Sequence, residues 1–214
     1  TYVLLWTPWW GMGLVVLLAL LLAASEYHTM AAPGADTTDR TVFTIACLLA
    51  ASWPVTTKIW PAVDQTALLL LAFFLLAGAR LMRPGELKTA MTRLGHDGFG
   101  LLYLGLTFPM IILLRDRPEG GWVVLMVMAV TFGSDTGGYF AGRFLGRHKL
   151  YPLISPKKTV EGAVGGVLLA IAMAFVAKAY FPGHEWLTTG HCVIIGTIGA
   201  GLTITGDLVE SLVK

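Results

Sequence analysis

The sequence predicts an all-α, polytopic transmembrane helical bundle with about seven spans in this chain. Of the 214 residues, 56% are hydrophobic and 13% are charged, and the mean hydropathy is +0.72. A soluble domain carries about 25% charged residues, so composition excludes a soluble globule, a disordered chain and a disulfide-stapled secreted module. Long apolar runs without alternating polar residues exclude a β-barrel. Helices are then the spanning elements that can satisfy their backbone hydrogen bonds in lipid.

The first three spans are expected at residues 2–24, 41–59 and 66–82. Trp6, Trp9 and Trp10 lie at one end of the first, where aromatic side chains gather at a membrane interface. This segment lacks a basic leader region and a clean cleavage site, so we interpret it as a span and not as a removed signal. Pro54 is expected to kink or end the second span. The connection between these two spans is expected to be a polar loop containing Glu26, His28, Asp36, Asp39 and Arg40.

The remaining spans are expected at residues 98–114, from 122 to a polar connection starting at 143, at 160–181, and from 191 to the last residue. A polar loop with Lys88 and Arg93 leads to the fourth span, and Arg115–Pro118 ends it. Pro182 and Gly183 make a turn before the final span. We see neither an internal repeat nor a low-complexity linker, so residues 1–214 are expected to form a single integral membrane domain.

The positions of Lys and Arg predict the orientation. With seven spans, one side of the membrane holds eleven of the 15 basic residues: Arg40, Arg80, Arg83, Lys88, Arg93, Arg143, Arg147, Lys149, Lys157, Lys158 and Lys214. The other side holds four: Lys58, Arg115, Arg117 and Lys178. Because positive residues stay in the cytoplasm, the first side is predicted to be cytoplasmic. The overall net charge of +2 predicts no nucleic-acid partner.

Cysteine and histidine are not expected to bind metal. Cys47 and Cys192 lie in apolar stretches without a CxxC or CxxH pattern, so we expect two buried small hydrophobic side chains without a disulfide. The histidines show no i,i+4 pair typical of a zinc site, and His96 beside Asp97 is an isolated pair.

The end of the fifth span carries the first candidate for chemistry. Asp135 lies in an apolar segment, where a carboxylate costs about 2.5–3.5 kcal/mol and faces a wet cavity or a partner. Asp135, Tyr139 and Arg143 share one stripe of the helix. The adjacent stripe is a small-residue face that allows close approach of another helix, formed by Ser134, Gly138, Gly142 and Gly146. A solvated carboxylate at the helix end is the alternative.

The connection after the fifth span is the second candidate. Ser155 or Thr159 can cap the next helix, with Pro156 suited to its first turn. Free N–H groups at a helix start, with Lys157 and Lys158 beside them, make a site for phosphate oxygens. Glu161 lies in the first turn, where the helix dipole favours a carboxylate. Alternatively, the lysines only set the topology. The helix is expected to pack closely through Gly162, Gly166, Ala170 and Ala174.

The terminal segment is the third candidate. Asp207, Glu210, Ser211 and Lys214 are spaced so that they line one helix face. The carboxylate pair of Asp207 and Glu210 at the cytoplasmic mouth of a bundle suits Mg²⁺, which takes oxygen ligands and keeps waters for phosphate. The alternative is a helix-end salt bridge between Glu210 and Lys214.

These three candidates converge at the predicted cytoplasmic edge. Acidic side chains, basic side chains and glycine-rich helix contacts at one end of a bundle favour phosphoryl or nucleotidyl transfer. In such reactions catalysis is mainly positioning plus neutralisation of charge by Mg²⁺ and cationic groups.

The sequence resembles the phosphatidate cytidylyltransferase family at these residues. The matching segments are 134–139, 142–143, 146–150, 155–162, 165–166 and 206–211. Residues 130–214 carry the resemblance, while the first 120 agree in being hydrophobic helices. A diagnostic signature of the family begins with Ser-x-x-Lys, matched by Ser211 and Lys214, and continues beyond the position of Lys214, so we expect the chain to be truncated at its C-terminus.

The resemblance implies nucleotidyl transfer from CTP to phosphatidic acid, giving CDP-diacylglycerol and pyrophosphate. Asp207 would be the Mg²⁺ ligand and a catalytic residue with Asp135 and Lys158, and a second, monovalent or divalent cation is left open. The substrate-binding residues would be Ser155, Lys157, Lys158, Thr159, Glu161, Ser211 and Lys214. Residues 1–120 would be a membrane scaffold, and 121–214 part of the catalytic region.

The setting implied is the bacterial inner membrane, with the active site on the cytoplasmic side and a homodimer left open. Three alternatives remain: a CTP-dependent enzyme acting on an isoprenoid lipid phosphate or alcohol, a transporter with an acidic ion path through Asp135 and Asp207, and a non-catalytic membrane scaffold.

Overall fold

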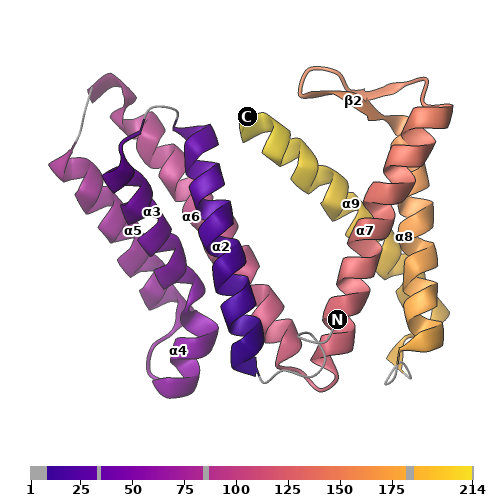
Figure 1. The fold of residues 1–214 in the computed structure, drawn as a ribbon, viewed down its shortest axis with the longest axis horizontal. Helices are drawn as coiled ribbons and strands as arrows, with labels where there is room; N and C mark the ends of the chain where they lie inside the picture. Colours follow the sequence, from indigo (N-terminus) through magenta and orange to yellow (C-terminus); the bar gives the residue numbers. More distant parts are fainter. Residues whose placement is uncertain (1–8, 33–34, 84–86, 182–185, 214) are drawn as a thin grey trace. The chain divides into compact units, whose positions relative to one another are not determined.

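The computed structural model describes residues 9–32, 35–83, 87–181 and 186–213, and these are almost entirely helical (Figure 1). The helices are α2 (Trp9–Ala31), α3 (Thr37–Ala51), α4 (Trp53–Ile59), α5 (Gln65–Met82), α6 (Leu87–Arg115), α7 (Gly120–Leu145), α8 (Val160–Tyr180) and α9 (Thr189–Val213). Within the described ranges, six helices are long and apolar enough to cross a membrane, and a bent pair raises the number to seven. The predicted fold class is confirmed, and the protein is a multi-pass membrane protein.

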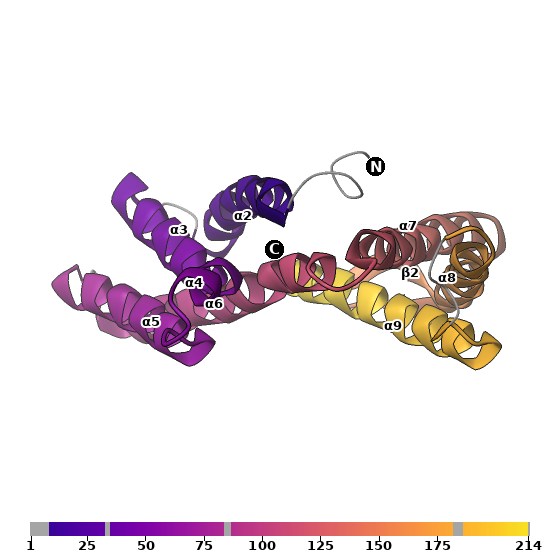
Figure 2. The same cartoon turned by 90° about the horizontal axis from the view of Figure 1, so that it is seen from below.

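The chain divides into two compact units between Arg117 and Pro118. We call α2–α6 the N-terminal unit and α7–α9, with the strands between them, the C-terminal unit (Figures 1 and 2). The division falls close to residue 120, where the sequence analysis separated scaffold from catalytic region. One membrane domain over residues 1–214 stays a prediction.

In the N-terminal unit, α3 contacts α2, α5 and α6. Its buried face consists of small and aromatic side chains, among them Phe43, Ala46, Cys47 and Ala50. The second predicted span is bent by 53° between α3 and α4, with Pro54 in the first turn of α4. Proline lacks the N–H needed to continue the preceding helix, so the predicted break at Pro54 is confirmed.

Two helices of this unit are longer than predicted at their polar ends. Helix α2 continues to Ala31, so Glu26 and His28 lie in a helix and not in a loop, and α6 begins at Leu87, so Asp97 is also helical. Residues 1–8, which include Trp6 and the predicted start of the first span, lie outside the described residues, as do Pro182 and Gly183.

The polar side chains in these extensions pair across helices. Arg80 donates from Nε to Asp97 Oδ2 over 2.7 Å and from Nη1 to Asp39 Oδ2 over 2.5 Å. His28 Nε2 lies 3.8 Å from Asp97 Oδ1, and Tyr27 donates to the backbone oxygen of His96 over 2.7 Å. Pairing between helices offsets the cost of burying these charged groups, so the polar stretches can remain helical.

In the C-terminal unit, α7 and α8 approach closely along the predicted small-residue faces. A Cβ added at Gly162 would lie 2.9 Å from the oxygen of Gly138, and one added at Gly166 would lie 2.9 Å from the oxygen of Ser134. Helix α9 contacts α8 at Gly196, where an added Cβ would lie 2.5 Å from Ile171 Cα. Glycine allows these backbones to approach in lipid, so close contact between α7 and α8 is confirmed.

The core of the C-terminal unit is small and apolar. It comprises Met126, Val130, Ala170, Ala174, Ala177, Leu187, Cys192 and Ala200. Cys47 in the N-terminal unit and Cys192 here are both free thiols, and the predicted burial of the two side chains is confirmed.

The connection between α7 and α8 contains a β-hairpin that the sequence analysis did not predict. Strands β1 (Lys149–Tyr151) and β2 (Ser155–Thr159) are antiparallel, with Lys149 opposite Thr159 and Tyr151 opposite Ser155. Pro156, expected in the first turn of the following helix, lies in β2. This expectation was wrong because residues 155–159 pair with β1, and helix α8 begins only at Val160.

Candidate active site

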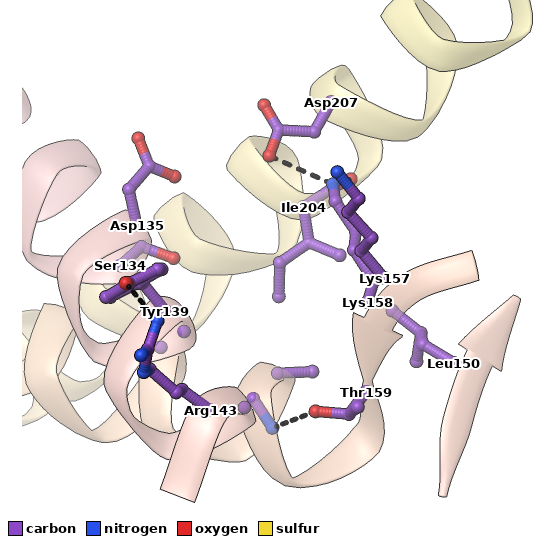
Figure 3. Close-up of a pocket in the computed structure, with 15 residues that line it drawn as sticks. Ser134, Asp135, Tyr139, Arg143, Leu150, Lys157, Lys158, Thr159, Ile204 and Asp207 are labelled. Carbon is purple, nitrogen blue, oxygen red and sulfur yellow. Dashed lines mark hydrogen bonds and ion pairs between the residues drawn. The ribbon is translucent and has the colours of Figure 1, made fainter. Parts of the chain in front are cut away.

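A cavity of about 420 Å³ lies in the C-terminal unit between α7, β2, α8 and α9 (Figure 3). Its ionisable lining side chains are Asp135, Tyr139, Arg143, Lys157, Lys158 and Asp207. They come from three separate segments of the chain, which are the three candidates for chemistry in the sequence analysis. The remainder of the lining is mostly glycine and small side chains from the contact between α7 and α8.

Helix α7 supplies one wall of the cavity. Ser134, Gly138 and Gly142 lie toward α8, and Gly138 would still place an added Cβ 3.6 Å from the oxygen of Gly162. This contact fixes the rotation of α7, so the adjacent stripe with Asp135, Tyr139 and Arg143 lines the cavity. Arg143 donates from Nη1 to the hydroxyl oxygen of Tyr139 over 3.1 Å, one helical turn away (Figure 3).

The hairpin and α9 supply the opposite wall, which carries both lysines. Lys158 Nζ donates to Asp207 Oδ2 over 2.9 Å and to the backbone oxygen of Ile204 over 3.4 Å (Figure 3). The Lys158 side chain is 24% exposed and that of Asp207 is 51% exposed. This ion pair therefore joins β2 to α9 while leaving much of the carboxylate open to a ligand.

Thr159 ends the hairpin and starts α8. Its Oγ1 accepts a hydrogen bond from the N–H of Gly162 over 3.1 Å, and the residue is buried. Of the two caps considered from the sequence, Thr159 is thus the one used. Its hydroxyl borders the cavity, but its oxygen already serves the helix start.

Glu161 contacts the backbone at the turn between α7 and β1. It accepts hydrogen bonds from the N–H of Arg147 over 3.0 Å and of His148 over 3.2 Å, and its Oε1 lies 2.6 Å from His148 Nδ1. The N–H of Val160 in turn donates to the oxygen of His148 over 2.9 Å. These contacts fix the base of the hairpin and hence the position of its lysines. Glu161 itself is not among the described residues that line the cavity.

Two further predicted binding residues, Ser155 and Ser211, are not among the residues that line the cavity. Ser155 is paired with Tyr151 at the far end of β2. Ser211 donates from Oγ to the backbone oxygen of Asp207 over 2.8 Å within α9. Lys214 lies outside the described residues. Among the described residues, the geometry therefore groups Asp135, Lys157, Lys158, Thr159 and Asp207 but not Ser155, Glu161 or Ser211.

The carboxylates of Asp135 and Asp207 both line the cavity, from α7 and α9 respectively. Over the described ranges, no group of three or more His, Cys, Asp or Glu side chains is placed to hold a metal ion. Two carboxylates are nevertheless the usual protein contribution to a Mg²⁺ site that is completed by substrate phosphates and water. The donor set thus fits Mg²⁺ bound together with a nucleotide, and not a closed structural site.

Arg143 and Tyr139 are cavity residues that the sequence analysis did not include among its site residues. Their spacing of four and eight residues from Asp135 was the available signal, because a helix places such residues on one stripe. Which stripe faces a cavity depends on how α7 packs against α8, and this is set by the glycines.

Comparison with known proteins gives consistent matches along the whole chain. The model of the cytidylyltransferase family matches residues 1–214. A phosphatidate cytidylyltransferase of Brucella suis biovar 1 (strain 1330) is 31% identical over 212 residues, covering 98% of this chain and 74% of that protein.

Staphylococcal proteins match a shorter part of the chain. A phosphatidate cytidylyltransferase of Staphylococcus saprophyticus is 38% identical over 113 residues, or 52% of this chain and 41% of that protein. One of Staphylococcus aureus (strain COL) is 35% identical over 111 residues, or 51% of this chain and 40% of that protein.

Proposed function

Because this chain belongs to the cytidylyltransferase family, we propose that it catalyses nucleotidyl transfer from CTP to phosphatidate, with CDP-diacylglycerol and pyrophosphate as products. The observation that carries the proposal is the cavity in which Asp135, Lys158 and Asp207 meet from α7, β2 and α9. Relatives that match most of this chain bear the name of this activity. A membrane enzyme with an ionic cavity at the ends of its spans suits one water-soluble and one lipid substrate.

The reaction joins the phosphate of the lipid to the α-phosphorus of CTP. An oxygen of the phosphatidate phosphate forms the new P–O bond, and the bond between the α-phosphorus and the oxygen bridging to the β-phosphate breaks. Pyrophosphate leaves with that electron pair. Both substrates are polyanions, so the main task of the protein is to neutralise and align them.

Lys157 and Lys158 are the residues that contact the triphosphate. Their ammonium groups come from β2, on the opposite side of the cavity from α7 (Figure 3). Lys158 is held by Asp207 and by the oxygen of Ile204, so its charge is positioned before the nucleotide binds. Preorganised charge of this kind stabilises the leaving group without reorganisation during the reaction. Thr159 and Glu161 support this wall by capping α8 and fixing the hairpin base.

Asp207 is the proposed ligand of Mg²⁺, with Asp135 as an auxiliary acid facing the same cavity. When bound, Mg²⁺ would supply Lewis-acid neutralisation of the phosphate oxygens. Asp207 accepts a hydrogen bond from Lys158 through Oδ2, so the same carboxylate would hold both the metal ion and the lysine that contacts the nucleotide.

The proposed location is the bacterial inner membrane, with the cavity on the cytoplasmic side. Support comes from the eleven basic residues assigned to that side, which include Arg143, Lys157 and Lys158. In this orientation CTP reaches the cavity from the cytosol and the lipid reaches it from the inner leaflet.

The direct test is turnover of radiolabelled CTP by the purified full-length protein in mixed micelles. With phosphatidate we expect CDP-diacylglycerol and an equal amount of pyrophosphate. A parallel reaction with an isoprenoid lipid phosphate should give no product. CTP turnover with the isoprenoid lipid but not with phosphatidate would overturn the proposal, and so would no CTP turnover with either lipid.

A further inference from the structure

The cavity has cationic side chains on two opposite walls, and both of its expected ligands are anions. Arg143 lies on α7, whereas Lys157 and Lys158 lie on β2 across the cavity (Figure 3). The carboxylates of Asp135 and Asp207 also line this space. Two separated cationic groups suit two separate phosphate ligands better than a single one.

The α7 wall is continuous with an apolar surface that suits acyl chains. Next to Tyr139 and Arg143, the rings of Phe140 and Phe144 are stacked with centroids 6.3 Å apart. These two side chains are 53% and 74% exposed within the C-terminal unit. Exposed apolar side chains grouped on a candidate membrane span suit contact with lipid hydrocarbon. Arg143 precedes Phe144 in the last turn of the same helix, so the cation and the apolar surface are adjacent.

The opposite wall has a different character. Lys157 is exposed and lies in β2, outside the helices that are candidate spans. Its neighbour Pro156 is exposed as well. This wall is therefore accessible from water, as a soluble nucleotide requires.

The side chain of Arg143 is also suited to a terminal phosphate. Its guanidinium can donate two parallel hydrogen bonds to two oxygens of one phosphate, whereas an ammonium acts as a point charge. The bond from Nη1 to the Tyr139 hydroxyl restrains the guanidinium on the cavity side of α7. Tyr139 acts here as a positioning residue.

We propose that Arg143 binds the phosphate of the lipid substrate, so that the cavity holds phosphatidate on its α7 wall and the triphosphate of CTP on its hairpin wall. This assignment rests on the proposed function. It means that the attacking phosphate and the leaving pyrophosphate are held from opposite walls of the cavity, as an in-line displacement at the α-phosphorus requires.

The test measures KM for each substrate in Arg143→Ala, Arg143→Lys and Lys157→Ala forms of the full-length protein. Loss of charge-assisted hydrogen bonds should raise KM for phosphatidate about tenfold or more in Arg143→Ala, with KM for CTP unchanged. Arg143→Lys should recover part of the loss. Lys157→Ala should show the reverse pattern. Lys149→Ala, which removes an exposed charge from β1 outside the cavity lining, is the matched control and should change neither constant.

A second measurement does not depend on turnover. Retention of radiolabelled phosphatidate by the purified protein without CTP should fall in Arg143→Ala and remain normal in Lys149→Ala. Glycerol 3-phosphate in excess tests whether the head group alone competes, and we expect competition weaker than that of short-chain phosphatidate.

The outcomes separate the two proposals. If the wild-type protein does not turn over CTP with phosphatidate, the proposed function fails. If it does, but Arg143→Ala raises KM for CTP or retains phosphatidate normally, the assignment of Arg143 is overturned. Complete loss of turnover in Arg143→Ala is decided by retention, where reduced lipid binding supports the assignment and normal binding contradicts it.

Discussion

The two units of this protein each hold a cluster of arginine or lysine with aspartate, but the clusters differ in exposure. In the N-terminal unit, the side chains of Arg80, Asp39 and Asp97 are only 11%, 18% and 3% exposed. In the C-terminal unit, the Asp207 side chain is 51% exposed and lines the cavity of about 420 Å³. Buried, mutually paired charges hold helices together, whereas exposed charges around a cavity are available to a ligand. The same residue types therefore have different roles in the two units.

The sharpest way to break this comparison is Arg80→Met. It would leave Asp39 and Asp97 without their cation, and removing one member of a buried ion cluster costs about 3–5 kcal/mol. We expect a large loss of thermal stability, measured by the intrinsic fluorescence of the protein in detergent during heating. KM for CTP and phosphatidate should be unchanged in the protein that remains folded.

Arg83→Met is the matched control for this effect. Arg83 pairs with Asp36 over 3.5 Å, and the two side chains are 55% and 63% exposed. Loss of such a surface pair should cost about 1 kcal/mol or less. Equal destabilisation by the two substitutions would remove the distinction between buried and exposed charge on which the comparison depends.

Asp207→Asn tests the open cluster. Loss of the carboxylate should reduce CTP turnover by about two to three orders of magnitude, because the amide neither ligates Mg²⁺ well nor holds Lys158 by charge. Thermal stability should change little. Asp116→Asn serves as control, because Asp116 pairs with Lys58 and is not among the residues that line the cavity, so turnover should stay normal. Near-normal activity of Asp207→Asn across a Mg²⁺ titration would contradict a metal role.

Replacing Lys157 and Lys158 together by alanine should raise KM for CTP about tenfold or more. The effect should grow weaker at high ionic strength, as expected for exposed charges. Labelling of an engineered cysteine at the hairpin from either side of the membrane reports the orientation. If the double substitution only inverts the orientation, these lysines are topology signals and not ligands.

The smallest effect is expected for Thr159→Ala. Loss of the Oγ1 cap should cost about 1 kcal/mol of stability and leave both KM values within a factor of about two. Thr159→Ser keeps the cap and should restore the stability. A large change in KM for CTP in Thr159→Ala but not in Thr159→Ser would instead indicate a direct contact of the hydroxyl with phosphate.

The sequence predicted the helical bundle and much of the cavity because both follow from local spacing. Four-residue repeats of glycine marked the contact of α7 with α8, and the same periodicity placed Asp135 and Arg143 on one stripe. Thr159 was recognisable as a cap from its residue type.

What the sequence did not predict depends on contacts between distant residues. The hairpin of β1 and β2 is held by backbone pairing and by Glu161, and strands of three and five residues carry too little pattern to be recognised. Similarly, His28 and Asp97 were assigned to loops because their polarity suggested water. Their burial becomes intelligible only once Arg80, from another helix, is placed beside them.

The central claim is that the cavity of the C-terminal unit holds the triphosphate of CTP. Photolabelling with a CTP analogue that carries its reactive group on the triphosphate, followed by peptide mapping of the full-length protein, tests this most directly. The account predicts labelled peptides within residues 147–166 or 204–213, with labelling suppressed by unlabelled CTP. Arg80 and Arg93 border a second cavity, of about 210 Å³, in the N-terminal unit. The account would be contradicted if the labelling that unlabelled CTP suppresses were confined to α2–α6.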